Sequence, residues 1–244
     1  MKRPLVCLCL CIVWAGFVRA EDGVKTLLHI DFNAGISLDG WQDIRQNAPP
    51  QSRFGALTFE SEDETKGSER HGYFSAMDPS FGVTAPLNEP YEVNERTVRV
   101  EVRAKVRCNG EAHTAGLDLS SRQYPDFPFQ YSHKLASGFG VQGYQHRTTA
   151  NRLYVYHPGE EAVLSPSSSA FAPMESGRHR WHDWRLVYDH VNHQLTFYLD
   201  GREVHQMEHV ALGGTVLQTL WMMGAPIGID YDHLVVEAVE KQIK

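Results

Sequence analysis

Cysteine is scarce in this chain, and its distribution excludes a disulfide framework. Of the four cysteines, Cys7, Cys9 and Cys11 lie within residues 1–20, and only Cys108 lies beyond them. If residues 1–20 are removed, Cys108 has no partner for an intrachain disulfide. A domain of this size does not need one, because it buries about 70–75% of its unfolded surface. We interpret Cys108 as a small buried hydrophobe, since the sequence shows no neighbouring base that would activate its thiol.

Long hydrophobic runs are absent except near the start of the chain. Residues 5–18 are apolar apart from their cysteines, follow Lys2 and Arg3, and lead into a small-residue cleavage pattern. A run of this length matches a signal-peptide core and is too short to span a bilayer comfortably. We therefore predict a signal peptide over residues 1–20 and one domain over residues 21–244 in a secreted, periplasmic or cell-envelope protein. The alternative is an uncleaved anchor.

Basic residues are in the minority. The chain has 23 Lys and Arg against 30 Asp and Glu, and the predicted signal peptide holds three of the basic residues. The remaining net charge of about −10 argues against nucleic acid or an anionic membrane as a partner. No second apolar stretch approaches the length of a membrane-spanning helix. The sequence also has no Asn-x-Ser/Thr acceptor, which together with the missing disulfide favours a bacterial envelope.

Alternation with a period of two is abundant. From Thr97 to Arg107, valine and alanine alternate with arginine, glutamate and lysine, which predicts a half-buried strand of roughly 30 Å at about 3.3 Å per residue. Further predicted strands are Leu27–Phe32, Ala56–Phe59, Gly116–Leu119, Gly138–Tyr144, Arg152–Tyr156, Trp184–Tyr188, Leu195–Leu199, Arg202–His205, Leu217–Met222 and Ile229–Val236. Many short strands separated by turn signals predict an all-β sandwich or barrel.

Three long segments between these strands are rich in Pro, Gly, Ser and charged residues. They cover residues 35–50, 61–89 and 158–178. Such compositions are typical of solvated loops. We predict that these loops lie on the rim of the sheets, where binding residues are usually found.

The C-terminal third carries a pattern that resembles a known family. Trp181–Asp189 reads WHDWRLVYD, Gln194–Val204 reads QLTFYLDGREV, and Ile229–Val236 follows as a closing strand. This strand–hairpin–strand pattern is similar to that of concanavalin A-like lectin/glucanase domains, including the laminin-G-like group. The resemblance implies an all-β fold, a two-sheet antiparallel jelly-roll sandwich. That fold hosts lectins, hydrolases, lyases and adhesion modules, so it does not select one function.

Two kinds of enzyme with this fold offer patterns for comparison. Laminarinase-type glycoside hydrolases place Glu-x-Asp-x-x-Glu or Glu-x-Asp-x-Glu on one strand, and no predicted strand contains either. Alginate lyase-like domains use Arg-x-Glu-x-Arg, which Arg99–Arg103 matches. A lyase set in this chain would be Arg103, His146 and Tyr156. Because the other lyase motifs are absent, we favour a charged strand face with cross-strand ion pairs.

The resemblance also implies a structural calcium ion. In similar domains, an aspartate of the closing strand helps to hold Ca²⁺ against the opening segment, and Asp232 occupies the matching position with Asp31 expected nearby. Ca²⁺ takes six to eight oxygen ligands, so two carboxylates make only part of a site, and the alternative is carboxylates in water. No other cofactor is expected, since the sequence has no His-Glu-x-x-His and its histidine pairs fall on predicted strands or turns.

Sugar binding needs a flat aromatic platform beside polar groups. The richest aromatic cluster is residues 124–131, YPDFPFQY, which two prolines stiffen into a loop. We predict that Tyr124, Phe127, Tyr131 and Tyr144 contact a polysaccharide or glycan; the alternative is a loop packed over the sandwich edge. Further candidates are Trp41, Tyr154 and Tyr156.

The sequence therefore favours an exported, non-catalytic carbohydrate-binding module of this fold. The first alternative is a polysaccharide-degrading enzyme, a lyase or glycoside hydrolase, and the second is a structural adhesion domain with protein partners. A lyase requires Arg, His and Tyr together in one cleft. A lectin requires aromatic rings with polar neighbours, and an adhesion domain requires an apolar patch.

Overall fold

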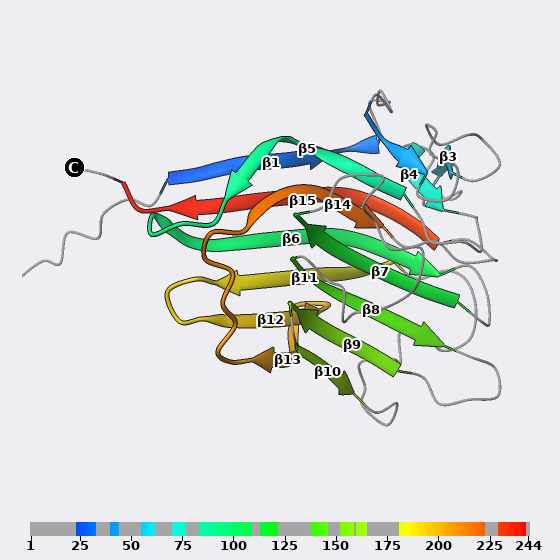
Figure 1. Cartoon of the computed structure of the whole chain (residues 1–244). Coiled ribbons are helices and arrows are strands. Elements are labelled where there is room, and N and C mark those ends of the chain that lie inside the picture. Colours follow the sequence, from blue (N-terminus) through cyan, green and yellow to red (C-terminus); the bar gives the residue numbers. More distant parts are fainter. Residues whose placement is uncertain are drawn as a thin grey trace, which may run out of the picture.

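Most of the chain is described by a computed structural model. The residues it describes are 23–32, 40–43, 55–61, 70–76, 83–108, 113–121, 138–145, 152–158, 160–164, 181–222 and 229–242. They form fifteen β-strands in two antiparallel sheets that lie one over the other (Figure 1). No helix in these ranges is long and apolar enough to cross a membrane. The predicted all-β fold, a two-sheet antiparallel jelly-roll sandwich, is confirmed.

The larger sheet, sheet A, has eight strands. Its strands in spatial order are β13 (Arg202–Met207), β12 (Gln194–Leu199), β11 (His182–Asp189), β6 (Thr97–Cys108), β15 (Ile229–Glu240), β4 (Arg70–Ala76) and β3 (Gly55–Ser61). The eighth strand, β1 (Gly23–Ile30), pairs with the second half of β15, while β4 pairs with its first three residues. Figure 1 shows β1 in blue beside β15 in red. Because β15 pairs with β1 on one side and with β6 on the other, it connects the start of the described chain to the centre of sheet A.

The second sheet, sheet B, has seven strands. They are β10 (Glu160–Leu164), β9 (Arg152–His157), β8 (Phe139–Gln145), β7 (His113–Ser120), β14 (Val216–Met222), β5 (Val83–Glu92) and β2 (Gln42–Asp43) in spatial order. Since β5 and β6 follow one another in sequence but lie in different sheets, the chain crosses between layers there. Both sheets therefore combine strands from distant parts of the chain.

The core lies between the sheets and is built by the alternation seen in the sequence. Val100, Val102 and Ala104 of β6 face inward, as do Leu117 and Leu119 of β7. Burying such a side chain contributes about 1.5–3 kcal/mol. The inner faces are therefore apolar, and the residues between these positions point away from the core.

One tyrosine links the two sheets directly. The hydroxyl of Tyr231 on β15 donates to the Gly116 carbonyl oxygen of β7 at 3.1 Å and accepts from the Gly116 N–H at 3.2 Å. Tyr231 is fully buried, and a buried phenol requires such partners. This contact satisfies backbone groups of β7 in a stretch where β14 does not pair with them.

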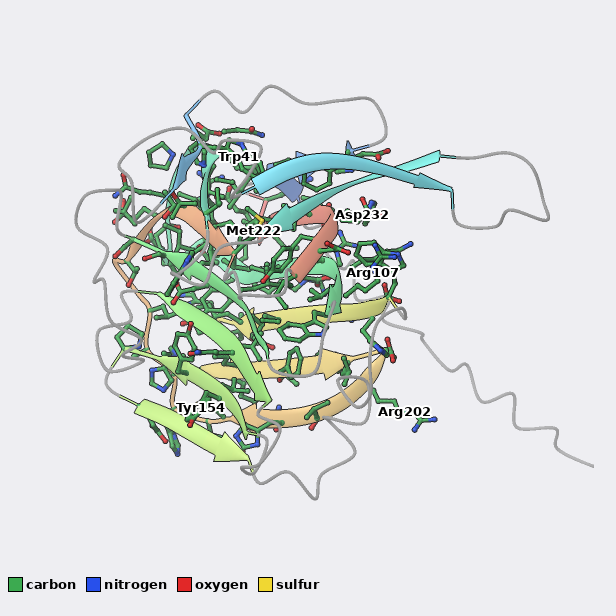
Figure 2. All side chains as sticks on the ribbon, turned by 90° about the vertical axis from the view of Figure 1, so that its right-hand side faces the viewer. Trp41, Arg107, Tyr154, Arg202, Met222 and Asp232 are labelled. Carbon is green, nitrogen blue, oxygen red and sulfur yellow. The ribbon has the colours of Figure 1, made fainter. Side chains whose placement is uncertain are left out.

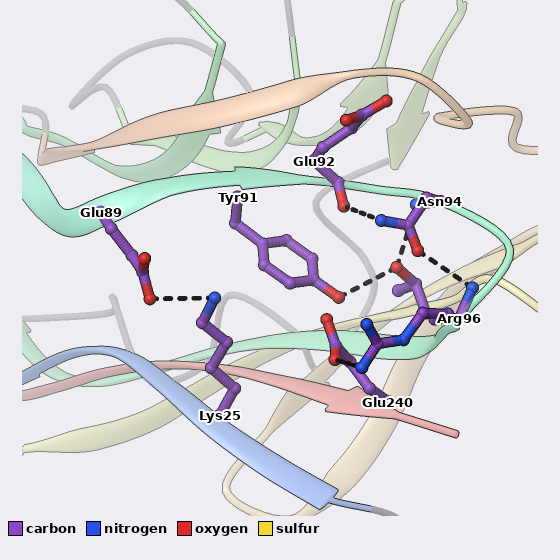
Figure 3. Close-up of polar contacts among 8 residues, drawn as sticks. Lys25, Glu89, Tyr91, Glu92, Asn94, Arg96 and Glu240 are labelled. Atoms are coloured by element: carbon purple, nitrogen blue, oxygen red, sulfur yellow. Dashed lines mark hydrogen bonds and ion pairs between the residues drawn. The ribbon is translucent and has the colours of Figure 1, made fainter. Parts of the chain in front are cut away.

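The turn between β5 and β6 is fixed by polar side chains (Figure 3). The N–H of Asn94 donates to Thr97 Oγ1 at 3.1 Å, and the N–H of Arg96 donates to Asn94 Oδ1 at 3.0 Å. The hydroxyls of Tyr91 and Thr97 are 2.9 Å apart. The Arg96 guanidinium binds Glu240 at 2.9 Å. These contacts tie the crossing between the sheets to the end of β15.

All three of the predicted loops contain strands. Residues 35–50 include β2, residues 61–89 include β4 and most of β5, and residues 158–178 include β10. Pro86 and Pro90 suggested a break in β5, because proline cannot donate to a ladder. However, β2 pairs only with Val83 and Thr84, and the β5–β14 register shifts beside the prolines. Proline is tolerated at such an edge, so the loop prediction is wrong there.

The predicted signal peptide falls outside the described part of the chain. Residues 1–20 precede β1, and the described ranges begin at Gly23. Export therefore stays a prediction from the sequence.

Candidate functional site on the outer face of sheet B

The side of sheet B that points away from the core carries a row of polar and aromatic residues. Thr84 of β5 pairs with Trp221 of β14, and Trp221 pairs with Asp118 of β7. Asp118 pairs with Gly140 of β8, which pairs with Tyr156 of β9. Paired residues in adjacent strands point to the same face. These five residues therefore form a continuous row across five strands, which we call the sheet B row.

Neighbouring positions extend the row into a face. Gln142 pairs with Tyr154 across β8 and β9, and Ser120 pairs with Thr219 across β7 and β14. We call the sheet B row together with these four residues the sheet B face. Among the side chains described on it, Asp118 is the one that carries a charge. The face thus combines aromatic rings with hydroxyl, amide and carboxylate groups.

The central contact of this face joins Tyr156 to Asp118. The Tyr156 hydroxyl donates to Asp118 Oδ2 at 3.0 Å, and both residues are buried. Gly140 lies between them: a Cβ there would be 2.6 Å from the Tyr156 hydroxyl and 2.7 Å from the Leu117 carbonyl oxygen. Only glycine therefore allows the tyrosine ring to cross β8 and reach the carboxylate.

The environment of Tyr156 fixes its protonation state. Burial raises the pKa of the Tyr156 phenol well above its usual range, and the nearby Asp118 charge raises this pKa further. The phenol therefore stays protonated at neutral pH and acts as a hydrogen-bond donor. A base that abstracts a sugar proton requires the opposite state.

Trp221 belongs to this face and not to the core. Leu220 and Met222 on either side of it are part of the connected apolar core, whereas Trp221 and Tyr156 are not. Trp221 is nevertheless 7% exposed, and Asp118 is 4% exposed. Tyr154 is more exposed than either. Hydrogen bonds of the face thus form in a low-dielectric setting, where they are strong.

Most of the predicted ligand residues fall outside the described ranges. This applies to Tyr124, Phe127 and Tyr131, and also to His146 of the lyase set. Tyr144 lies on β8, where its backbone pairs with that of Arg152 on β9. The contacts predicted for these residues stay predictions.

Trp41 corrects one sequence interpretation. It was a candidate sugar platform, but it is buried in the core and packs against Phe32 with ring centroids 6.4 Å apart. Its position just before β2 explains this, because β2 covers the edge of sheet B beside β5. An aromatic ring at a sandwich edge closes the core there.

Arg103 lies on the opposite outer face of the sandwich. Its guanidinium binds Glu237 of β15 at 2.5 Å and lies 3.2 Å from Glu101. Arg185 of β11 also binds Glu101, at 2.8 and 2.9 Å, and stacks over Tyr198 of β12. We call these five residues the sheet A ladder. The ion pairs of this ladder agree with the charged strand face that the sequence favours.

The lyase set is therefore not brought together. Arg103 points outward from sheet A, since Val102 and Ala104 beside it are core residues, and Tyr156 points outward from sheet B. Figure 2 shows Arg107 of β6 and Tyr154 of β9 toward opposite sides of the molecule. The core between the sheets therefore separates Arg103 from Tyr156.

The two carboxylates predicted for calcium lie near each other. Burial raises the pKa of Asp232, the N–H of His233 lowers it by donating to Asp232 Oδ1 at 2.7 Å, Lys105 also lowers it, and the charge of Asp31 raises it. In the described ranges, no three ligating side chains already surround one point. Since Ca²⁺ needs six to eight oxygens, these carboxylates supply part of a shell, and the calcium site stays a prediction.

Sequence reasoning missed Asp118, Gln142 and Trp221. Each lies in a predicted strand, and the available signal was the position of Asp118 between two leucines, where alternation turns it outward. The register that brings Asp118 beside Trp221 joins residues more than a hundred positions apart. No local pattern contains that information.

No family model matches this chain, and no curated protein matches it. Solved structures with a similar fold include a lectin from Bauhinia forficata in complex with GalNAc, with 10% identity over 90% of this chain and 99% of that chain and a TM-score of 0.46. A protein with a galectin-like fold from Bacillus subtilis is 10% identical over 91% of this chain and 99% of that chain, with a TM-score of 0.46. A legume lectin-like domain from Entamoeba histolytica is 10% identical over 78% of this chain and 89% of that chain, with a TM-score of 0.44.

Proposed function

We propose that this protein binds a carbohydrate without cleaving it, and that the sheet B face is the binding surface. The observation that carries the proposal is the row in which Trp221, Asp118 and Tyr156 follow one another across adjacent strands. A pyranose ring has an apolar face and a rim of hydroxyls, so it needs an aromatic ring and hydrogen-bonding groups side by side. The sheet B row supplies both.

Each member of the face has a separate part in this proposal. Trp221 provides the apolar platform, and the Asp118 carboxylate accepts hydrogen bonds from sugar hydroxyls. Gln142 can both donate and accept, which suits a hydroxyl in either orientation. Tyr156 holds Asp118 in place through the bond at 3.0 Å. Tyr154 is the most exposed of the three aromatic residues of the face, and in this proposal it contacts the ligand first.

Two observations support a binding role over a lyase role. Tyr156 is held in its protonated form, because both burial and the Asp118 charge raise its pKa. Arg103, the cation of the lyase set, is engaged by Glu237 and Glu101 on the other side of the sandwich. The proposal also includes export, which the predicted signal peptide over residues 1–20 supports.

The test is binding of the purified protein to a polysaccharide panel by affinity electrophoresis, with mass spectrometry of the secreted protein to locate its N-terminus. We expect retarded migration with at least one glycan, and a loss of at least about tenfold in affinity for Trp221→Ala and Asp118→Asn, which corresponds to about 1.4 kcal/mol. Arg202→Ala, an exposed residue of β13, is the matched control and should bind normally.

Three outcomes would contradict the proposal. Binding that survives both sheet B substitutions would move the site elsewhere. New reducing ends or unsaturated ends in the glycan would show an enzyme. Failure to bind any glycan would favour the adhesion alternative. Far-ultraviolet circular dichroism of each variant distinguishes lost binding from lost folding.

A further inference from the structure

A short connecting segment closes one end of the sandwich. Residues 208–215, which we call the strap, run from β13 at the edge of sheet A to β14 inside sheet B (Figure 1). Val210 and Leu212 of the strap are buried and belong to the connected apolar core. On the sheet B side, the Gly214 N–H donates to the Val93 carbonyl oxygen at 2.7 Å. Releasing the strap would therefore expose core side chains to water.

The hydroxyl of Tyr188 fastens the strap to sheet A. Tyr188 lies at the end of β11 and is fully buried. Its hydroxyl oxygen accepts from the Leu212 N–H at 3.3 Å, and its proton has two acceptors within reach, the Val210 carbonyl oxygen at 3.4 Å and Nδ1 of His190 at 3.0 Å. The Val210 N–H also donates to the His193 carbonyl oxygen at 2.9 Å. The strap is thus held by the end of β11 and by the turn that follows it.

His190 contacts both this hydroxyl and the strap. The rings of His190 and Tyr188 have centroids 5.8 Å apart, and a Cβ at Gly213 of the strap would lie 3.8 Å from Cε1 of His190. The centroid of the His193 ring lies 5.7 Å from that of His190. A proton added to His190 therefore places a positive charge beside the strap and beside a second imidazole.

Charged groups from several elements surround His190. The titratable and charged residues on these elements are Asp189 and His193 of its own turn, Lys241 after β15, Arg99 of β6, and Glu208 and His209 of the strap. Burial lowers the pKa of His190, and the charges of His193 and Lys241 lower it further. The charge of Asp189 raises it. Because burial has the largest effect, His190 is neutral at neutral pH.

We propose that Tyr188 and His190 form an acid-sensitive clasp, which holds the strap while His190 is neutral and releases it when His190 is protonated. A neutral Nδ1 can receive the Tyr188 proton, whereas imidazolium can only donate. Its charged N–H then competes with the Leu212 N–H for the same hydroxyl oxygen, and the charged donor forms the stronger bond. The Leu212 contact, at 3.3 Å, is the one that is lost. Opening the strap also returns the cation to water, which favours the open state.

Acid should weaken the clasp. The pKa of His190 is lower with the strap closed than its ordinary value of about 6.5, so the closed state binds a proton less readily than the open state. The closed state therefore has its full stability above about pH 6.5 and loses part of it as pH falls from there through the lower folded pKa. Burial raises the pKa of Tyr188, so its hydroxyl stays protonated throughout. The clasp lies outside the sheet B face, and its test does not depend on glycan binding.

The test is hydrogen–deuterium exchange of the whole folded protein, followed at single amides by NMR at about pH 7.5 and about pH 5 and expressed as protection factors. We expect the protection of the Leu212 amide to fall by about threefold or more at the lower pH, and that of the β6 amides to fall less. His190→Gln should give equal protection of Leu212 at both pH values, because glutamine accepts a hydrogen bond and does not titrate. Tyr188→Phe should lower this protection at both pH values, because the Leu212 N–H loses its acceptor.

His205 supplies a matched control. Burial also lowers its pKa, and it lies on β13, outside the strap. His205→Gln should therefore change how the stability of the whole protein depends on pH, but acid should still lower the protection of Leu212. Three results would overturn the proposal: protection of Leu212 that does not depend on pH, an acid effect that persists in His190→Gln, or an equal loss of protection at Leu212 and throughout β6.

Discussion

The two outer faces of this sandwich are built on the same alternation but carry different chemistry. On sheet A, Arg185 and Arg103 share the buried carboxylate of Glu101, and Glu237 continues the pairing onto β15. On the sheet B face, the described side chains carry one charge, that of Asp118, whose carboxylate accepts a hydrogen bond from the neutral hydroxyl of Tyr156. Paired charges neutralise one another and leave little for a ligand, whereas aromatic and amide groups can recognise an uncharged surface.

The sheet A ladder and the sheet B row also differ in how far water reaches their side chains. The side chains of Arg103 and Arg185 are 40% and 42% exposed, so water screens their ion pairs. The residues of the sheet B row are buried, so their contacts act at low dielectric. We expect substitutions on the sheet B face to change stability and binding strongly, and substitutions in the sheet A ladder to change stability weakly and binding not at all.

The largest effect is expected for Gly140→Ala. The added Cβ would be 2.6 Å from the Tyr156 hydroxyl and 2.7 Å from a backbone oxygen, and such overpacking costs up to about 3 kcal/mol. Urea denaturation should show this loss together with weaker glycan binding, because Tyr156 is displaced from Asp118. Gly23→Ala, where a Cβ meets nothing within 4 Å, is the control. Equal stability of the two variants would mean that the tyrosine does not depend on the glycine.

The sequence predicted one of these faces better than the other. The sheet A ladder was anticipated because β6 alternates without interruption, so Arg99, Glu101 and Arg103 fall on one side by inspection. The resemblance in residues 181–204 covered the neighbouring strands, and β11 and β12 lie where they were predicted. The alternation of β6 can be seen within one stretch of the sequence, so it predicts the sheet A ladder without knowledge of which strands pair.

The sheet B face required information that is not local. The sequence places Asp118 and Trp221 in separate strands, but only the register joins them. Pro86 and Pro90 concealed β5, since their tolerance depends on the short neighbour β2. Aromatic content alone does not distinguish a core ring from a binding platform, and Trp41 is a core ring. In each of these examples, the position of the residue depends on which strands pair in the folded protein, and the sequence alone does not show that pairing.

A smaller effect, with a pH signature, is expected for Tyr156→Phe. Losing the hydrogen bond to a buried carboxylate costs about 1–2 kcal/mol near neutral pH. The pKa of Tyr156 is raised in the folded protein above the usual value of about 10. The folded state therefore keeps a proton that the unfolded chain loses, and stability falls as pH rises above about 10 through the folded pKa.

Urea denaturation between pH 8 and pH 11.5 should reveal this difference. The unsubstituted protein should lose stability over the alkaline range more steeply than Tyr156→Phe. The slope will not vanish in the variant, because burial also raises the pKa of Tyr91 and of Tyr188. Asp118→Asn should reduce the slope too, since the Asp118 charge contributes to the shift. Parallel profiles for all three proteins would contradict a buried Tyr156–Asp118 pair.

The smallest effect is expected for Arg185→Met in the sheet A ladder. This change removes two hydrogen bonds to Glu101, but Arg103 remains 3.2 Å from that carboxylate. Because the Arg185 side chain is 42% exposed, the loss should be about 1 kcal/mol or less in low salt and should shrink as salt is added. Glycan affinity should equal that of the unsubstituted protein, since the ladder and the sheet B face are separated by the core. A variant that kept its stability but lost glycan binding would reverse the assignment of the two faces, because it would place the ligand on the charged side of the sandwich.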